Sequence, residues 1–326
     1  MSLMSSAIYC PLPSALNPNG AEAQAASLGW ARRHELLPTE ALYTRLEKIQ
    51  LGTLGARFFP DASADALRIA TDWLVLFFLT DDLSERPEVH PIDTALLLGR
   101  QVNVLRGTEP SQRDVPMGSA FEDLRLRMTS MFSEAWFARF ADKVADLFAG
   151  FAWEAINRKN RFVPHADLYL EARKTTIGLS PLIELADADR ARPAGTAARM
   201  RPDVARLEGQ ACSLVGMAND LFTYARELDE GDYHNLVLVL MREKKIGAAQ
   251  AEELVVGMHN ERMRQWFQLA ERLRHDDPDE GTRRFVTALG HLLRGHLDWA
   301  YENGRYQVSP TLPPKVAVAR EEGSSG

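Results

Sequence analysis

The chain has 326 residues, of which 45% are hydrophobic and 25% are charged, a composition typical of globular proteins. Its formal net charge of −7 argues against nucleic-acid and anionic-membrane partners, so an anionic ligand must be held by local cations or by metal. Cys10 and Cys212 are too few for a disulfide framework or a zinc site, and no membrane span or signal peptide is predicted, so we expect a cytoplasmic protein.

The first residues, 1–20, are rich in proline and asparagine and predict an extended arm, in which Met1–Leu3 resemble a remnant of expression cloning. Beyond the arm, apolar residues recur at three- and four-residue spacing, which predicts amphipathic helices. Strand-like alternation of β-branched and aromatic residues is missing, so the predicted fold class is all-α. The predicted helices are residues 21–36, 40–56, 64–79, 92–105, 120–155, 166–188, 197–228, 233–243, 248–274 and 280–302.

The organisation of the chain favours one helical domain over residues 21–306. No long linker and no shift in composition divides this stretch. More helices are predicted than a four-helix bundle needs, which suits a bundle with a central cavity whose site is built from facing side chains. The polar tail, residues 307–326, is expected to be partly disordered.

The most informative segment is an apolar helix that begins near Trp73 and ends in the carboxylates of Asp81, Asp82 and Glu85. Asp81 and Glu85 are four residues apart and share a helix face with Trp73 and Phe77. Negative charge at a helix C-terminus opposes the helix dipole, so this end favours a bound cation. Hard oxygen ligands suit Mg²⁺. The segment therefore predicts a metal site at the rim of an apolar wall.

A second acidic run shows how common such a pattern is. Residues 276–280 also fit a loose DDxxE motif, but Pro278 interrupts any helix and no aromatic stripe precedes them. We interpret this run as an exposed helix start, where acidic residues are favoured. An acidic pair before a loop is by itself usually a solvated helix end, so the metal-site prediction depends on the aromatic stripe before Asp81.

A second cluster of oxygen donors lies on a later predicted helix. Asn219, Thr223 and Glu227 follow one another at four-residue steps and form a single stripe of possible metal ligands. The small residue Gly216, one turn earlier, would let a ligand approach the helix backbone. Arg226 is next to Glu227 and is placed to reach an anion held by the same metal.

Together the two clusters resemble the metal-binding motifs of the bacterial class I terpene synthases, DDxxE followed by NDxxTxxxRE. Arg226 stands where the family usually has a lysine. The segments 9–18 and 231–237 are also similar to the family, and the resemblance spans residues 9–306. It implies a class I terpenoid synthase-type helical bundle with a central active-site cavity.

The resemblance also implies a catalytic role for two arginine-containing segments. Arg173 would sense the diphosphate, Thr176 would act as the linker, and the backbone carbonyl of Ile177 would face the reacting allylic carbon. Near the C-terminus, the pair Arg305–Tyr306 with the upstream Trp299 matches a family motif. Each residue alone resembles an ordinary surface or helix-end residue, so the assignment depends on their joint occurrence in the family's order.

The implied chemistry is the ionisation of a prenyl diphosphate, in which metal and cationic side chains spread the negative charge of the leaving group. By the resemblance, three Mg²⁺ ions take part. Asp81, with Glu85, would hold two of them, and Asn219, Thr223 and Glu227 would hold the third, while Asp82 supports the first site.

The remaining implied contacts concern the substrate. Arginine forks suit diphosphate oxygens, a tyrosine hydroxyl adds a donor, and aromatic faces stabilise carbocations. No base is assigned, because the diphosphate product can itself take the proton. The expected diphosphate contacts are Arg173, Arg226, Arg305 and Tyr306, and the expected cavity residues are Phe77, Phe78, Trp299 and Gly216, with Trp73 and Trp153 as further aromatic candidates.

The predicted reaction is the cyclisation of farnesyl diphosphate to a sesquiterpene. A diterpene synthase acting on geranylgeranyl diphosphate stays open as an alternative function. A homodimer stays open as the oligomeric state. A trans-prenyltransferase would carry a second aspartate-rich motif, whereas this chain has Asn219, Thr223 and Glu227 instead. An inactive helical binding protein is disfavoured because every polar position that the chemistry needs is filled.

Overall fold

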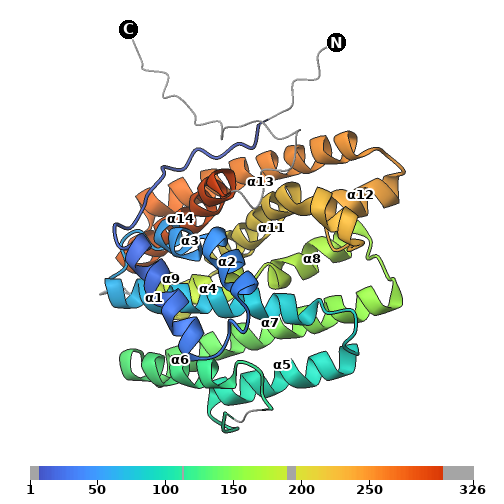
Figure 1. Cartoon of the computed structure of the whole chain (residues 1–326). Helices are drawn as coiled ribbons and strands as arrows, with labels where there is room; N and C mark the ends of the chain where they lie inside the picture. Colours follow the sequence, from blue (N-terminus) through green and yellow to red (C-terminus); the bar gives the residue numbers. More distant parts are fainter. Residues whose placement is uncertain (1–6, 112–113, 189–195, 304–326) are drawn as a thin grey trace.

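The computed structural model of the chain describes residues 7–111, 114–188 and 196–303, which contain helices and no β-strand (Figure 1). The predicted all-α fold is therefore confirmed. None of the helices in these ranges is long and apolar enough to cross a membrane. The helices are α1 (Gly20–Arg33), α2 (Glu40–Ile49), α3 (Leu51–Phe58), α4 (Ala64–Ser84), α5 (Pro91–Arg106), α6 (Gly118–Met131), α7 (Glu134–Asn160), α8 (Ala166–Thr176), α9 (Leu179–Ala188), α10 (Thr196–Arg199), α11 (Pro202–Glu230), α12 (Leu236–Lys244), α13 (Ala248–Asp276) and α14 (Glu280–Glu302).

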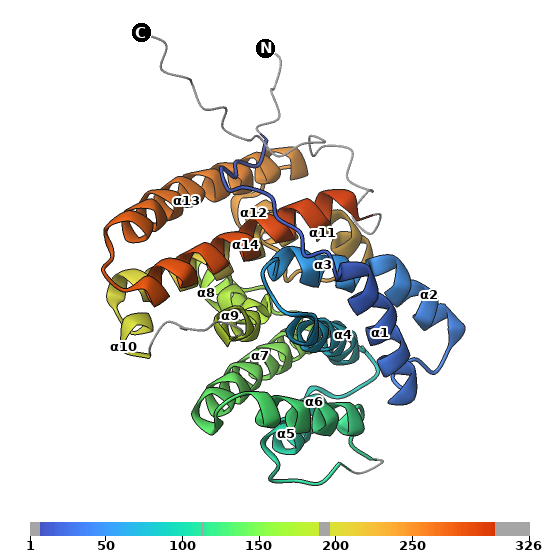
Figure 2. The same cartoon turned by 90° about the vertical axis from the view of Figure 1, so that its left-hand side faces the viewer.

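The helix α4, which ends in the first acidic cluster, lies in the interior of the bundle (Figure 2). It packs against α1, α3, α6 and α7. The helix α11, which carries the second cluster, packs against α8, α12, α13 and α14. Because α14 contacts both α3 and α11, and α7 contacts both α4 and α8, these helices join the two parts of the bundle around a shared interior.

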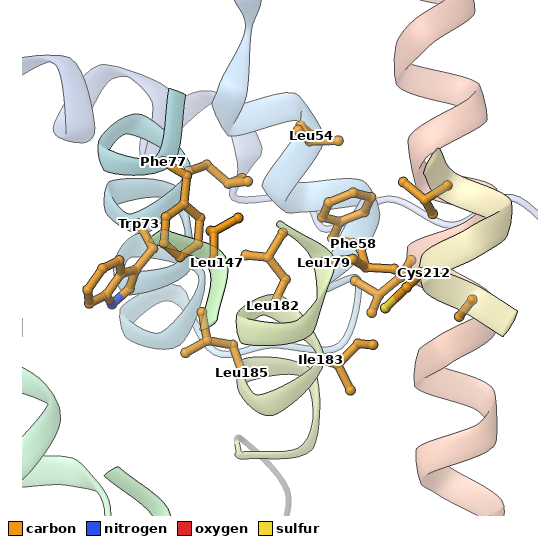
Figure 3. Packing of buried hydrophobic residues seen from close by; sticks show 14 of the residues in the cluster. Leu54, Phe58, Trp73, Phe77, Leu147, Leu179, Leu182, Ile183, Leu185 and Cys212 are labelled. Atoms are coloured by element: carbon orange, nitrogen blue, oxygen red, sulfur yellow. The ribbon is translucent and has the colours of Figure 1, made fainter. Parts of the chain in front are cut away.

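The floor of this interior is a layer of buried apolar side chains (Figure 3). The short helix α9 contributes Leu182 and Ile183, which pack among residues from α3, α4 and α7. Trp73 of α4 is fully buried there, and its indole N–H donates to the sulfur of Met128 at 2.9 Å. Burial of such large side chains is the main favourable term in folding, and here it also forms the base of a pocket.

Four of the ten predicted helices are each divided in the structure, and one of them, 197–228, breaks between Arg199, where α10 ends, and Pro202, where α11 begins. The range 40–56 breaks at Gln50, which adopts a left-handed conformation with φ of 56° between α2 and α3. The range 120–155 breaks before Ser133, whose hydroxyl accepts a hydrogen bond from the Trp136 N–H and caps α7. Apolar spacing continues across these last two breaks, so periodicity alone did not reveal them.

The fourth divided helix is residues 166–188, and its break forms part of the pocket. Helix α8 ends at Thr176, Gly178 adopts a positive φ of 73°, and α9 begins at the next residue. Glycine populates that left-handed region without the steric cost that a Cβ would impose. The turn lets α9 run beneath the pocket rather than continue the axis of α8.

The N-terminal arm lies along α13 and α14 before it enters α1 (Figures 1 and 2). Asn17 fastens the end of the arm, because its amide donates to the carbonyls of Phe59 and Ala62 at 3.0 and 2.8 Å. Nearby, the Arg57 side chain on α3 pairs with Asp298 on α14 at 3.0 Å. These contacts hold α3 against α14, and α14 forms one wall of the pocket.

Candidate active site

A pocket of about 150 Å³ opens among α4, α7, α8, α9, α11 and α14, with an apolar interior and a polar mouth. Phe77, Phe78 and Trp299, which the sequence places in the cavity, all line it. The Phe78 and Trp299 rings meet edge to face, with centroids 6.3 Å apart. The interior is therefore walled by aromatic faces of the kind that stabilise a cation.

The other two aromatic candidates do not line this pocket. Trp73 lies behind Phe77, with ring centroids 5.3 Å apart, and it is fully buried. A stripe at four-residue steps drifts around a helix of 3.6 residues per turn, which turns Trp73 away from the face of Asp81. Trp153 packs its ring against His234 at 5.8 Å, outside the pocket wall.

The first acidic cluster stands at the mouth, where α4 ends. Asp81 lies in the last turn and Glu85 is the C-cap, and both side chains line the pocket. Asp82 points to the outer side instead, where a carboxylate oxygen accepts a hydrogen bond from Arg45 at 2.8 Å. The structure thus brings the two predicted ligands together and separates Asp82 from them.

The second cluster faces the first from α11, and Asn219, Thr223 and Glu227 all line the pocket. The Thr223 hydroxyl donates to the Asn219 carbonyl at 3.0 Å. The side-chain amide of Asn235 donates to the Thr223 hydroxyl at 3.3 Å and to Glu227 at 2.9 Å. Asn235 therefore orients two of the three predicted ligands, although the sequence alone assigned it no role.

The carboxyl groups at the mouth have raised pKa values. Burial, and then the charge of Glu154, raises the pKa of Asp81 to about 7. Burial and the charge of Asp220 raise the pKa of Glu227 to about 7. Glu85 is exposed to solvent at the mouth, yet surrounding protein atoms and the charge of Asp81 raise its pKa too. The mouth thus holds more negative charge than its own cations balance.

Arg173, on the last turn of α8, forms hydrogen bonds with residues of the second cluster. Its guanidinium donates to the side-chain oxygen of Asn219 at 2.8 Å and to Asp220 at 3.1 Å. Asp220 is fully buried and also accepts a hydrogen bond from the Tyr169 hydroxyl at 2.8 Å. These hydrogen bonds fix the orientation of the Arg173 guanidinium beside the pocket, and the buried Asp220 carboxylate balances its positive charge.

Gly216 has a different role from the one predicted, because it makes room for Arg173 rather than for a ligand. A Cβ atom at Gly216 would come within 2.9 Å of the Arg173 Cγ, and Gly216 does not line the pocket. Thr176 and Ile177 do line it, together with the left-handed Gly178. Arg173, Thr176 and Ile177, the three residues for which the resemblance implies a joint catalytic role, therefore all line the same pocket.

The last predicted diphosphate contacts are arginines and a tyrosine. Arg226 lines the pocket mouth, where it pairs with Glu230 at 3.2 Å and with Glu227 at 3.4 Å. To contact the diphosphate as predicted, the Arg226 guanidinium would have to leave these two carboxylates. Arg305 and Tyr306 lie outside the described residues.

A set of hydrogen bonds made by Arg158 across the mouth was not predicted from the sequence. Arg158 on α7 donates to Asp232 at 3.0 Å and to the carbonyl of Ser84, at the end of α4, at 3.4 Å. Asp232 also accepts a hydrogen bond from the His234 ring at 2.8 Å. Although burial alone would raise it, that bond and the Arg158 charge hold the Asp232 pKa well below its usual range. Arg158 thus links the ends of α4 and α11.

The donor set at the mouth fits a hard divalent cation. Carboxylate, amide and hydroxyl oxygens are the ligands that Mg²⁺ prefers, and a bound cation would favour the charged forms of Asp81 and Glu227, whose pKa values are raised mainly by burial. Among the described residues, no three His, Cys, Asp or Glu side chains form a ready-made metal cluster. Such a divided set also suits Mg²⁺, which keeps waters and is commonly bound by few carboxylates together with substrate phosphates.

We expect Mg²⁺ to stabilise the protein more at pH 8 than at pH 6. The folded pKa values of Asp81 and Glu227, about 7, lie above unfolded values of roughly 4. The metal-free protein therefore loses stability as the pH rises from about 4 through 7. At pH 6 each group is mostly protonated, which lowers metal affinity by roughly tenfold per group.

The measurement is the shift in melting temperature on adding Mg²⁺ alone, so that the titration of diphosphate plays no part. The Asp81→Asn variant serves as the control, because its shift should depend less on pH. Equal shifts at pH 6 and pH 8 for the unaltered protein would contradict this account of the mouth.

The chain also matches known proteins. The family model described as "Terpene synthase family 2, C-terminal metal binding" matches residues 72–265, a range that includes both oxygen clusters and Arg173. Germacrene A synthase of Nostoc punctiforme is 31% identical over 308 residues, which cover 93% of this chain and 95% of that protein. A (+)-T-muurolol synthase of Roseiflexus castenholzii, described as cyclising (2E,6E)-farnesyl diphosphate, is 28% identical over 95% of this chain and 97% of its own.

Solved structures agree with the fold. The crystal structure of a linalool/nerolidol synthase from Streptomyces clavuligerus superimposes with a TM-score of 0.80 at 24% identity, covering 90% of this chain and 99% of the other. The family match, the relatives and the helical fold thus agree with one another. The chain belongs to the bacterial class I terpene synthases.

Proposed function

We propose that this terpene synthase is a Mg²⁺-dependent cyclase that converts farnesyl diphosphate to a sesquiterpene and releases diphosphate. The observation that carries the proposal is the composition of the pocket, in which Asp81 of α4 and Asn219 of α11 line the same aromatic cavity. Several relatives are described as cyclising (2E,6E)-farnesyl diphosphate, such as a (−)-β-caryophyllene synthase of Saccharothrix espanaensis. That protein is 27% identical over 94% of this chain.

In this proposal the mouth binds the diphosphate end of the substrate. Asp81 and Glu85 hold metal on the α4 side, and Asn219, Thr223 and Glu227 hold it on the α11 side. Bound Mg²⁺ would neutralise charge on the leaving group as the C–O bond breaks. Arg173, Arg226 and Arg305 grip diphosphate oxygens, and Tyr306 donates a hydroxyl hydrogen bond.

The interior holds the hydrocarbon chain. Phe77, Phe78 and Trp299 present aromatic faces to the cation, and the apolar wall excludes water that would trap it. Arg158, tied to Asp232 and to the end of α4, keeps the two sides of the mouth at a fixed separation.

Some features of the proposal come from the sequence and from the family resemblance. The resemblance implies three Mg²⁺ ions and leaves a homodimer open as the assembly. The sequence predicts one catalytic domain over residues 21–306 and a cytoplasmic location. Metal titration by calorimetry in the presence of diphosphate would count the ions. Light scattering coupled to size-exclusion chromatography would decide between a monomer and a dimer.

The decisive experiment incubates the purified protein with Mg²⁺ and the C10, C15 or C20 prenyl diphosphate in parallel, with gas chromatography–mass spectrometry of the products. A cyclic C15 hydrocarbon or alcohol, lost on adding a metal chelator, supports the proposal. A product from the C20 substrate alone would make the enzyme a diterpene synthase. A longer diphosphate formed only with isopentenyl diphosphate would make it a prenyltransferase, and no turnover of any substrate would indicate a binding protein.

A further inference from the structure

Two histidines line the pocket: His234, whose ring donates to Asp232 at the mouth, and His296, which lies in the aromatic and aliphatic wall. His296 lies on α14, one turn before Trp299, and both side chains line the pocket. The wall around it is built from apolar side chains such as Phe58, Leu182 and Val215. His296 is 5% exposed, so its imidazole is almost wholly enclosed by protein. It lies outside both metal motifs and outside the residue range that matches the family model.

In the described part of the chain, one ring nitrogen of His296, Nδ1, lacks the hydrogen bond that a buried polar atom normally makes. Its Nδ1 atom is fully covered and has no hydrogen-bond partner within the described residues. Its neighbour Trp299, by contrast, donates its indole N–H to the carbonyl of Ile49 at 3.0 Å. A buried polar atom without a partner lowers stability, so a leucine or phenylalanine would fit this wall at less cost. Packing and stability therefore do not explain why a histidine occupies this position.

The electrostatic surroundings of His296 keep the imidazole neutral. Burial, and then the positive charge of Arg173, lower the pKa of His296 to about 3. The ring thus carries a lone pair at neutral pH, in a pocket built to hold a carbocation. A neutral base within an apolar wall is suited to removing a proton from such a cation.

We propose that His296 is the proton acceptor that ends the carbocation reaction, an inference that rests on the function proposed above. A C–H bond on the carbon next to the cationic centre breaks, and its electron pair forms the new C=C bond. The imidazole lone pair takes the proton, so the positive charge passes from the hydrocarbon to the ring. The product leaves the pocket as a neutral alkene.

The same surroundings return His296 to its neutral form. An imidazolium beside Arg173 in an apolar wall is a strong acid, and the diphosphate released in the reaction is a far better base. The proton therefore moves to diphosphate at the pocket mouth and leaves the enzyme with it. The low basicity of His296 does not prevent the first step, because an alkyl carbocation is a much stronger acid than any imidazolium.

The test uses two substitutions of nearly equal shape, His296→Asn and His296→Leu. Asparagine keeps an oxygen lone pair that can accept a proton, whereas leucine has none. Diphosphate release is measured together with the product composition by gas chromatography–mass spectrometry. We expect all three proteins to release diphosphate at similar rates. The share of the main wild-type alkene should persist in the Asn variant and fall by about tenfold or more in the Leu variant.

The Leu variant should lose the main alkene to alcohols or to other alkene isomers, because the cation then survives until water or diphosphate reaches it. Its melting temperature should equal or exceed that of the wild type, since an unpaired nitrogen is removed. If His296→Leu does not fold, the pair His296→Gln and His296→Phe answers the same question. The control is His259→Asn, a buried histidine on α13 that does not line the pocket and whose replacement should leave the product unchanged.

Identical product mixtures from the Asn and Leu variants would overturn the proposal, because shape rather than the lone pair would then decide the product. A wild-type product made only of alcohols would also overturn it, since no carbon-bound proton would be lost. These failures differ from a failure of the proposed function, in which the wild-type protein would release no diphosphate from any prenyl substrate.

Discussion

The Asp81→Asn substitution is expected to slow diphosphate release by about 10³-fold at saturating substrate, while the protein stays folded. Asparagine keeps the size of the side chain and one oxygen but removes the charge that, in the proposed function, would hold metal at the end of α4. Losing one preorganised electrostatic contact to a developing charge typically costs about 10² to 10³ in rate. Since burial and neighbouring carboxylates already raise the Asp81 pKa, removing its charge should not lower stability at pH 8.

The matched control is Asp276→Asn, the same substitution in the look-alike acidic run at residues 276–280. Asp276 is exposed at the end of α13, and Asp279 in the same run caps α14 by accepting a hydrogen bond from the Thr282 N–H at 2.7 Å. The run joins α13, which ends at Asp276, to α14, which begins at Glu280, so the predicted helix start is present, but Asp277 is buried and pairs with Arg201 rather than being exposed. Asp276→Asn should leave turnover unchanged. Retention of full activity by Asp81→Asn would show that the metal site has been placed at the wrong helix end.

The metal motifs could be predicted from the sequence because their geometry is local. Residues four apart on a helix share a face whatever the rest of the chain does. Asp81 with Glu85, and Asn219 with Thr223 and Glu227, therefore needed only a correct helix assignment to be placed together. That these two helices face each other across one pocket was not a local property, and it came from the family resemblance.

The features that escaped prediction depend on long-range contacts or on local backbone geometry. Arg158 and Asp232 are 74 positions apart in the chain, and nothing near either residue indicates their pairing. The break at Gln50 relies on a left-handed non-glycine residue, which carries no sequence signal. His296 did leave a signal, a polar ring one turn before Trp299 on an apolar helix face, but a buried histidine is more often structural than functional.

Arg173 is expected to be the most sensitive cation of the site, and two of its contacts explain why. In this structure it donates to the Asn219 side-chain oxygen, the atom that a metal would need, and to the buried Asp220. In the proposed function, Asn219 would hold metal through this oxygen, and the Arg173 guanidinium would then be available to bind the diphosphate. Arg173→Met should therefore slow diphosphate release by about 10²- to 10³-fold.

The Arg173→Met variant should also unfold more easily, by about 3–5 kcal/mol in the free energy of unfolding, because it leaves Asp220 buried without a cation. Lys174→Met is the matched control on the next residue. Lys174 forms a surface pair with Glu171 at 2.7 Å, and such pairs contribute at most about 1 kcal/mol. Chemical denaturation and the diphosphate-release assay on both variants give the two readouts.

Arg173→Lys separates the two roles of this arginine. Lysine restores a positive charge beside Asp220, so most of the lost stability should return. It cannot reproduce the planar fork that holds two oxygens at once, so diphosphate release should stay at least about 10²-fold below that of the wild type. If activity returned together with stability, Arg173 would serve only to neutralise Asp220, and the diphosphate contact would have to be assigned to another cation at the mouth, with Arg158 and Arg226 the nearest described candidates.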